Sequence, residues 1–230
     1  MVYDIYAADL EGDEYKEVIA AGSSGDKGLF VLGYDGTLKW NYQWEDGVEI
    51  CVTDVYAADL DGDGFKEVIV GSNTWEPRVL SYDGTVKWSS ISVRTVYAAD
   101  LDGYGYKEVI GGGVGYVYVY NYAGVQRWRG DCGDFCAIYA ADLDGDGFKE
   151  IIAAPRIRGD TVKVFGISVL FGDFDCDGEV TVADITRVAS RWRAREGGPD
   201  YAPCYDVDHD GDVDIVDIMK VAAHWGDTWE

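Results

Sequence analysis

Acidic residues of this chain gather in short loops, and their spacing is that of metal ligands. In the stretch VYAADLDGDGFKEVIVGS, four carboxylates fall within nine residues: Asp59, Asp61, Asp63 and Glu67. Carboxylates held this close repel one another unless a cation lies between them. Ca²⁺ takes its ligands from oxygen, whereas zinc and copper favour His and Cys, which these loops lack. The spacing therefore predicts a Ca²⁺ site between two strands.

The same loop occurs four times in one register. A polar turn with chance acidity is an alternative for one copy, but repetition disfavours it for four. Tyr104 replaces the acid at position five of the third copy, which predicts the weakest site. Side chains at positions one, three, five and nine and the carbonyl at seven are the expected ligands. They are Asp9, Glu11, Asp13, Tyr15 and Glu17; Asp59, Asp61, Asp63, Phe65 and Glu67; Asp100, Asp102, Tyr106 and Glu108; and Asp142, Asp144, Asp146, Phe148 and Glu150.

The sequence on either side of these loops predicts β-strands. Each loop separates two apolar runs such as VYAADL and KEVIVGS, and a third run and a hairpin follow. The hairpins are YDGTLKW, YDGTVKW and YAGVQRW, and Asp-Gly between apolar runs is a strong hairpin signal. Four strands in about 42 residues is the size of one propeller blade. The fourth repeat lacks the hairpin. We therefore predict a mainly β fold over residues 1–170, a propeller-like array of four (about three and a half) four-stranded blades.

A different pattern occupies residues 171–230. DFDCDGEVTVAD and DVDHDGDVDIVD both fit a twelve-residue Ca²⁺ loop, with Asp at position twelve in place of the usual Glu. Each leads into a helical pattern that would place Trp192 or Trp225 on its apolar face. This predicts a small α domain with two Ca²⁺ loop–helix units. The expected ligands are Asp173, Asp175, Asp177, Glu179, Thr181 and Asp184, and Asp206, Asp208, Asp210, Asp212, Asp214 and Asp217.

Two family resemblances follow from these motifs. The repeated DxDGDGFxE pattern over about residues 2–170 resembles the FG-GAP (VCBS, integrin-α-like) propeller repeats, which implies structural Ca²⁺ within blades of adhesion proteins, lectins or accessory domains. The double loop–helix segment resembles a dockerin, which implies docking onto a cohesin of another protein. An alternative is that the docking face packs on the chain's own repeats. The docking positions implied by the resemblance are Val182, Ala183, Ser190, Arg191, Ile215, Val216, Ala223 and His224.

Charge and cysteine content limit which partners and which cellular location are expected for this protein. The net charge of −24 disfavours nucleic acid and anionic membrane surfaces as partners, and no stretch approaches the length of a membrane span. Scattered cysteines in a calcium-rich β protein fit an oxidising, extracellular or cell-surface location. We predict disulfides between Cys132 and Cys136 and between Cys176 and Cys204, with Cys51 left over; buried thiols throughout are the alternative.

The motifs favour assembly over catalysis. The chain has two histidines and no GxSxG, HExxH or phosphate-binding glycine loop, so we expect no enzymatic activity, with a glycosidase carboxylate pair as the alternative. We expect a non-enzymatic, extracellular Ca²⁺-binding assembly or adhesion protein that docks onto a cohesin-like partner or a neighbouring subunit, as an oligomer or within a larger complex. The alternative is a carbohydrate-binding propeller, with Trp44 and Trp75 as exposed stacking residues, or an accessory fragment of a secreted polysaccharide-degrading complex.

Overall fold

The computed structural model divides the chain into two compact units, each described by itself below. The first comprises residues 1–101 and 106–166, and the second comprises residues 102–105 and 167–230. Within the described part, no helix is long and apolar enough to cross a membrane. The structure describes residues 2–22, 28–44, 51–72, 78–89, 93–103, 105–133, 136–145, 148–155, 161–166, 171–174, 178–198, 200–201, 205–208 and 210–228.

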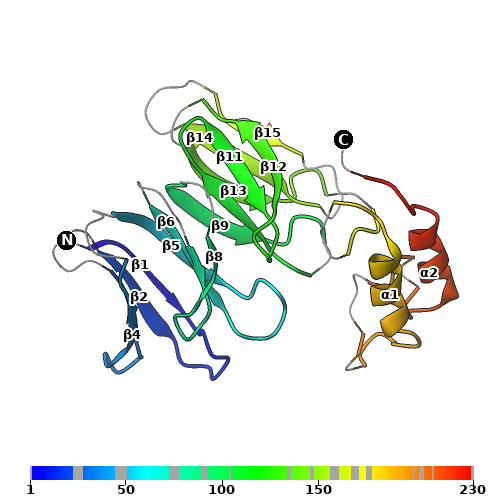
Figure 1. Ribbon diagram of the computed structural model, residues 1–230, viewed down its shortest axis with the longest axis horizontal. Helices are drawn as coiled ribbons and strands as arrows, with labels where there is room; N and C mark the ends of the chain where they lie inside the picture. The colour runs from blue at the N-terminus through cyan, green and yellow to red at the C-terminus, as the bar shows by residue number, and fades with distance from the viewer. Residues whose placement is uncertain are drawn as a thin grey trace. The chain divides into compact units, whose positions relative to one another are not determined.

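The first unit consists of four antiparallel sheets, which we call blades one to four (Figure 1). Consecutive strands pair, so each blade is a simple meander. Within the described residues, blade four has three strands where the others have four. The predicted mainly β, propeller-like architecture is confirmed. The strands are β1 (Val2–Ala8), β2 (Glu17–Gly22), β3 (Leu29–Leu32) and β4 (Leu38–Tyr42); β5 (Val52–Ala58), β6 (Glu67–Ser72), β7 (Arg78–Leu80) and β8 (Val86–Ser89); β9 (Thr95–Ala99), β10 (Glu108–Gly112), β11 (Tyr116–Tyr120) and β12 (Gln126–Asp131); and β13 (Cys136–Ala141), β14 (Glu150–Pro155) and β15 (Lys163–Phe165).

Each blade has the acidic loop at one end, and blades one and two also have an Asp-Gly hairpin between their third and fourth strands. In blade one, Asp35 Oδ1 accepts the Thr37 N–H at 2.9 Å, and Gly36 adopts a φ of 81°. Blade two repeats this with Asp83 and Thr85. The turn residues therefore set the pairing of the third and fourth strands.

Neighbouring blades bury their apolar faces against each other. We call the face toward the following blade the rear face and the face toward the preceding blade the front face. Rear-face residues of blade one and front-face residues of blade two belong to one buried cluster, and blades two and three repeat it. The residues are Leu10, Ile19 and Val31 with Val55, Val68 and Leu80, and then Leu60, Ile69 and Val79 with Val96, Val109 and Tyr120.

Polar contacts repeat with the same period as the apolar ones. The backbone N–H of Lys66 donates to the Leu10 carbonyl of the preceding blade at 3.0 Å. Lys107 and Lys149 donate in the same way to Leu60 and Leu101, each at 2.9 Å. Because every junction pairs the same loop positions, one repeat sequence specifies all three junctions.

Aromatic residues form a second series across the blades. The rings of Tyr6, Tyr56, Tyr97 and Tyr139 follow one another with centroids 5.0, 5.0 and 5.2 Å apart. At the outer edge, Trp40 Nε1 donates to the Tyr82 carbonyl of the next blade at 2.7 Å, and Trp88 Nε1 to the Tyr122 carbonyl at 2.9 Å. The tryptophans that end the hairpins of blades one and two are therefore packing residues.

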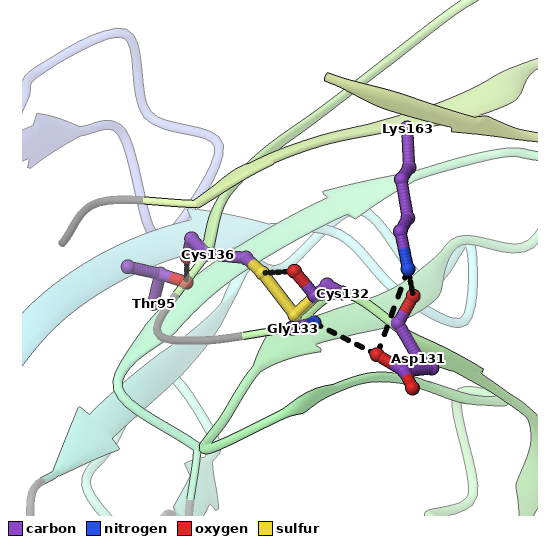
Figure 2. The surroundings of a disulfide bond; sticks show 6 residues. All are labelled: Thr95, Asp131, Cys132, Gly133, Cys136 and Lys163. Carbon is purple, nitrogen blue, oxygen red and sulfur yellow. Dashed lines mark hydrogen bonds and ion pairs between the residues drawn. A yellow bond between two sulfur atoms is a disulfide. The ribbon is translucent and has the colours of Figure 1, made fainter. Parts of the chain in front are cut away.

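A disulfide lies at the junction between blades three and four (Figure 2). It joins the first predicted pair, Cys132 and Cys136, between β12 and β13. Thr95 Oγ1 of blade three donates to the Cys136 carbonyl at 2.7 Å, and Lys163 Nζ of blade four donates to the Asp131 carbonyl at 2.8 Å. The disulfide thus shares this junction with hydrogen bonds from both blades. The second predicted pair, Cys176 with Cys204, lies outside the described residues.

The described part of the second unit contains two helices, α1 (Val182–Ser190) and α2 (Ile215–Ala222). Its buried core includes Phe174 and Tyr205, and equivalent valines from the two halves: Val180 with Val213, and Val188 with Val221.

The halves of the second unit pair reciprocally. Val180 N–H donates to the Asp227 carbonyl after α2, while Val213 N–H donates to the Ala194 carbonyl after α1, both at 2.9 Å. The return bonds run from Gly226 N–H to Val180 and from Arg193 N–H to Val213, both at 2.8 Å. This exchange gives the unit a pseudo-twofold arrangement.

Candidate functional site

The first acid of the repeated loop organises the turn. Asp59 Oδ1 accepts the Gly62 N–H at 2.7 Å and its Oδ2 accepts the Gly64 N–H at 3.1 Å. Glu67, at position nine, is buried and accepts the Leu60 N–H at 2.9 Å. These contacts turn the carboxylates toward one another. Oxygens within 4.8 Å of one another are offered by Asp59, Asp61 and Glu67; by Asp100, Asp102 and Glu108; by Asp142, Asp144 and Glu150; and by Asp206, Asp208 and Asp210.

The acid at position five does not join its predicted site in blade two. Asp63 Oδ1 accepts the Phe65 N–H at 2.8 Å, so the side chain folds back onto its own turn. Asp13 does the same with Tyr15 in blade one. The short reach of Asp to the amide two residues later explains this difference from the predicted ligand set.

A lysine enters the acidic loops of blades one and two, and sequence analysis missed it. Lys87 Nζ, from β8, lies 2.7 Å from both Asp61 Oδ2 and Glu67 Oε1. Lys39, from β4, lies 2.9 and 2.8 Å from Glu11 and Glu17. The lysine ammonium neutralises part of the negative charge of the loop, whereas the prediction assigned that neutralisation to a metal ion alone. The available signal was the Lys that precedes the hairpin Trp in YDGTLKW and YDGTVKW.

The pKa values of the pair reflect this contact. Burial raises the pKa of Glu67, and Lys87 opposes that shift. Partial burial would lower the pKa of Lys87, but its hydrogen bonds to Asp61 and Glu67 outweigh burial and raise it. Because the folded-state pKa of Lys87 exceeds its unfolded value, its stabilising contribution is complete below about pH 10.5 and is lost as pH rises through the folded-state pKa.

One carboxylate oxygen of loop two lacks a partner although the lysine is close by. Asp61 Oδ1 is buried and has no hydrogen-bond partner among the described residues. A buried carboxylate oxygen without a partner is costly unless a cation faces it. The residues of loop two therefore fit a Ca²⁺ ion, with Asp59, Asp61 and Glu67 as the side chains that would hold it.

The four loops differ in what supplies positive charge. Among the described residues, blade four has three strands, so the strand that carries the lysine in blades one and two has no described counterpart there. In loop one, Asp9 accepts three backbone N–H groups, and its described carboxylates do not gather as in the other loops. Tyr104 and Asp146 lie outside the described residues.

Substituting Lys87 by Met should destabilise the protein and increase its response to Ca²⁺. Loss of the ammonium leaves buried Glu67 without its counter-charge, at a cost of about 1–3 kcal/mol in the free energy of unfolding, because part of the lysine stays in water. Added Ca²⁺ should restore more stability to this variant than to the parent.

Urea unfolding with and without Ca²⁺ measures both effects. Lys163→Met is the control. The Lys163 and Asp131 side chains are 40% and 70% exposed, so loss of their 3.6 Å ion pair and of the hydrogen bond from Lys163 to the Asp131 carbonyl should cost no more than about 1 kcal/mol. Equal losses in the two variants would contradict the role assigned to Lys87.

The second C-terminal loop has the clearest metal geometry of the second unit. Asp206 is buried and accepts the Gly211 N–H at 2.9 Å and the Tyr201 hydroxyl at 2.7 Å. Asp208 Oδ1 is buried without a hydrogen-bond partner among the described residues. Burial, then repulsion from Asp210, raises the pKa of Asp208. A cation would remove that repulsion, so this loop also fits Ca²⁺.

The Asp at position twelve has a structural reason in both loops. Asp217 Oδ2 accepts the Asp214 N–H at 2.7 Å and caps α2, while its Oδ1 accepts the Val207 N–H at 2.7 Å inside the loop. Asp184 caps α1 in the same way through the Thr181 N–H at 2.8 Å. Both aspartates are buried, and each binds back to the cap three residues earlier. Of the other first-loop ligands, Asp173 is buried, while Asp175 and Asp177 lie outside the described residues.

Position nine caps the helices as well. Thr181 Oγ1 accepts the Ala183 N–H at 3.1 Å, and Asp214 Oδ1 accepts the Val216 N–H at 2.6 Å. Each predicted ligand at this position therefore already stabilises a helix start. The remaining predicted groups are Glu179 and Asp212. Glu179 forms an isolated β-bridge with Thr228, and Asp212 forms one with Arg195.

The predicted docking residues lie mostly at the surface. Val182, Ile215 and Val216 are exposed at the starts of the two helices. Ala183, Ser190, Arg191 and Ala223 are also exposed, and His224 is half-buried with Nδ1 2.9 Å from Asp227 Oδ2. An exposed apolar pair thus stands at equivalent places of the two halves.

Three tryptophans do not lie where the pattern placed them. Trp192 and Trp225 are exposed rather than on the buried helix face, because α1 ends at Ser190 and α2 at Ala222. Trp44, predicted as an exposed stacking residue, is buried in the cluster of blades one and two, with Tyr42 edge-on at 5.0 Å. Trp75 lies outside the described residues.

Comparisons with known proteins find one family match and several similar solved structures. Residues 171–224 match the family described as Dockerin type I domain. The biofilm matrix protein Bap1 of V. cholerae is similar at 26% identity and a TM-score of 0.54, over 65% of this chain and 23% of that chain. BamB from Moraxella catarrhalis is 19% identical with a TM-score of 0.46, over 65% of this chain and 42% of that chain. The chain thus spans about a quarter of Bap1. A comparison with curated protein sequences finds no match.

Proposed function

We propose that this chain is a non-enzymatic, extracellular assembly or adhesion protein, whose dockerin region docks onto a cohesin-like partner and whose blades are FG-GAP-type Ca²⁺ repeats. One observation carries the proposal. The segment that matches the dockerin family presents exposed apolar residues at both equivalent helix starts, Val182 in one half and Ile215 in the other.

The chemistry of this face defines its partner. Val182, Ala183, Ile215 and Val216 offer small apolar side chains without hydroxyl groups. Apolar groups at the centre of an interface contribute most when the partner removes them from water. The partner should therefore present an apolar patch. Because the two halves are related by the pseudo-twofold, either helix start could meet it.

Ca²⁺ would act as a structural ligand in this proposal. Asp206, Asp208 and Asp210 would hold it in the second loop, and the unpartnered oxygen of Asp208 supports that assignment. The ion would neutralise the loop and fix the start of α2, which bears Ile215. Docking should therefore require Ca²⁺. The disulfide of the first unit supports an oxidising, extracellular setting.

Charge placed on the docking face should abolish partner binding only when both halves carry it. In Val182→Asp or Ile215→Asp alone, the intact half still binds, so affinity should fall about twofold for statistical reasons. In the double variant both orientations bury an unpaired carboxylate, and affinity should fall at least about a hundredfold. Titration calorimetry against a panel of cohesin domains in Ca²⁺ measures this.

Val125→Asp is the control, since Val125 is exposed on a blade-three hairpin and belongs to the first unit. Circular dichroism should confirm that every variant keeps its helices. Full affinity of the double variant for a cohesin that binds the parent chain would refute the proposed face.

A further inference from the structure

The first unit presents two unpaired halves of the interface that its own blades use three times. At each junction, a rear face packs on the front face of the next blade. Rear-face leucines Leu10, Leu60 and Leu101 are at most 2% exposed, yet their blade-four counterpart Leu143 is 54% exposed. The valines behave alike: Val31, Val79 and Val119 are at most 1% exposed, but Val164 is 53% exposed. The rear face of blade four is therefore an uncovered copy of a buried face.

The front face of blade one is the matching half. Ile5 is 60% exposed, whereas its counterparts Val55 and Val96 are 3% and 6% exposed. Val18 and Leu32 of the same face are half-buried, although Val68 and Leu80 at the equivalent places of blade two are fully buried. The residue types are those that the rear faces of blades one to three already accept.

The hydrogen-bonding groups of the two ends also correspond. Lys149 donates its backbone N–H to the Leu101 carbonyl and its Nζ to the Asp100 carbonyl, the latter at 2.7 Å. Lys16 occupies the same loop position in blade one and is exposed, whereas Lys149 is half-buried. The carbonyls of Asp142 and Leu143 are the equivalent acceptors at the rear of blade four. Tyr139, the exposed end of the tyrosine series, would likewise meet Tyr6.

We propose that the rear face of blade four binds the front face of blade one of a second copy of this chain, and that two copies closed head to tail form one eight-bladed ring. The interface is heterologous, and its closure by a twofold axis uses both ends of both chains. Eight blades lie within the range of about four to eight blades usual for propellers. This contact is separate from the dockerin docking proposed above, because it uses no residue of that unit.

One part of the interface would be weaker than the internal junctions. The described part of blade four has no counterpart of the fourth strand whose tryptophan covers the next hairpin in blades one and two. Correspondingly, no described atom lies within 4 Å of the place where a Cβ on Gly36 would point. Ala137 replaces Asp4 and Asp54, which accept the N–H groups of Val55 and Val96. Self-association should therefore be reversible and depend on concentration.

Light scattering coupled to size exclusion tests the proposal with the full chain in Ca²⁺. The parent should show twice the 25.3 kDa of one chain and dissociate on dilution. Ile5→Asp and Leu143→Asp each place a carboxylate in the interface and should weaken self-association at least about a hundredfold. Both sites are exposed within one chain, so each variant should keep the circular dichroism spectrum of the parent.

Mixing the two variants gives the decisive result. A mixed pair retains one junction between unaltered Leu143 and unaltered Ile5, so the mixture should form a dimer that neither variant forms alone. Val114→Asp, at an exposed turn of blade three, should leave the dimer intact. The double docking-face variant should also stay dimeric, and its dissociation would place the contact in the dockerin region instead. A monomeric parent, or a mixture that stays monomeric, overturns the proposal.

Discussion

Removing Ca²⁺ with EDTA should lower the melting temperature sharply and unfold the C-terminal unit before the blades. An ion that binds only the folded state stabilises it by about 2.7 kcal/mol at a concentration of 100 times its dissociation constant. The second unit has a core of a few residues around Phe174 and Tyr205. Small cores leave little net stability, so a metal contribution of this size decides whether the unit folds.

The blades should resist EDTA better for a reason visible in their loops. Lys39 and Lys87 already neutralise part of the charge in blades one and two, and the interblade clusters do not involve metal. Calorimetry in Ca²⁺ and in EDTA should therefore show a low-temperature transition that moves with chelation. Helical circular dichroism near 222 nm should be lost in that first transition.

A pair of aspartate substitutions assigns the effect to the loop. Asp208→Asn removes one charge from the candidate site and should reduce the shift caused by Ca²⁺, whereas Asp200→Asn, at an exposed residue outside both loops, should not. An unchanged melt in EDTA would contradict the metal assignment for the whole chain. Equal Ca²⁺ shifts in the two variants would contradict it for this loop alone.

Repetition made the blades predictable. Apolar alternation and the acidic loop recur in all four repeats, and a hairpin motif recurs in three, so an error in interpreting one copy is corrected by the others. The three-stranded blade four was expected, because its sequence carries no hairpin motif. The lysine contacts were harder to foresee. Lys87 lies 20 residues from Glu67 and reaches it only through the pairing of β6, β7 and β8.

The predicted positions of the three tryptophans are wrong for a different reason. Helical periodicity continues in the sequence to Trp192 and Trp225, but periodicity does not mark where a helix ends. The segments that follow α1 and α2 turn to pair with Val213 and Val180, and that long-range exchange releases both side chains to the surface. Trp44 was predicted to be exposed, whereas packing between blades one and two buries its side chain.

Gly124→Ala should be among the most damaging single substitutions in the first unit. Gly124 has a φ of 87°, and a Cβ there would lie 2.7 Å from the ring of Trp88 in the preceding blade. That ring cannot withdraw freely, because its Nε1 donates to the Tyr122 carbonyl at 2.9 Å. Left-handed backbone costs an alanine about 1–2 kcal/mol, and loss of the Trp88 packing should bring the total to about 3–5 kcal/mol in the free energy of unfolding.

Gly36→Ala separates the two contributions. Gly36 adopts a similar φ of 81° at the same place of its hairpin, but no atom lies within 4 Å of the Cβ it would gain. This variant should therefore lose only about 1–2 kcal/mol in urea unfolding. In a Trp88→Ala background, the ring is gone, and Gly124→Ala should cost no more than Gly36→Ala does. If the losses at the two glycines were equal in the parent, backbone strain alone would explain both, and the packing of each tryptophan on the next hairpin would not hold neighbouring blades together.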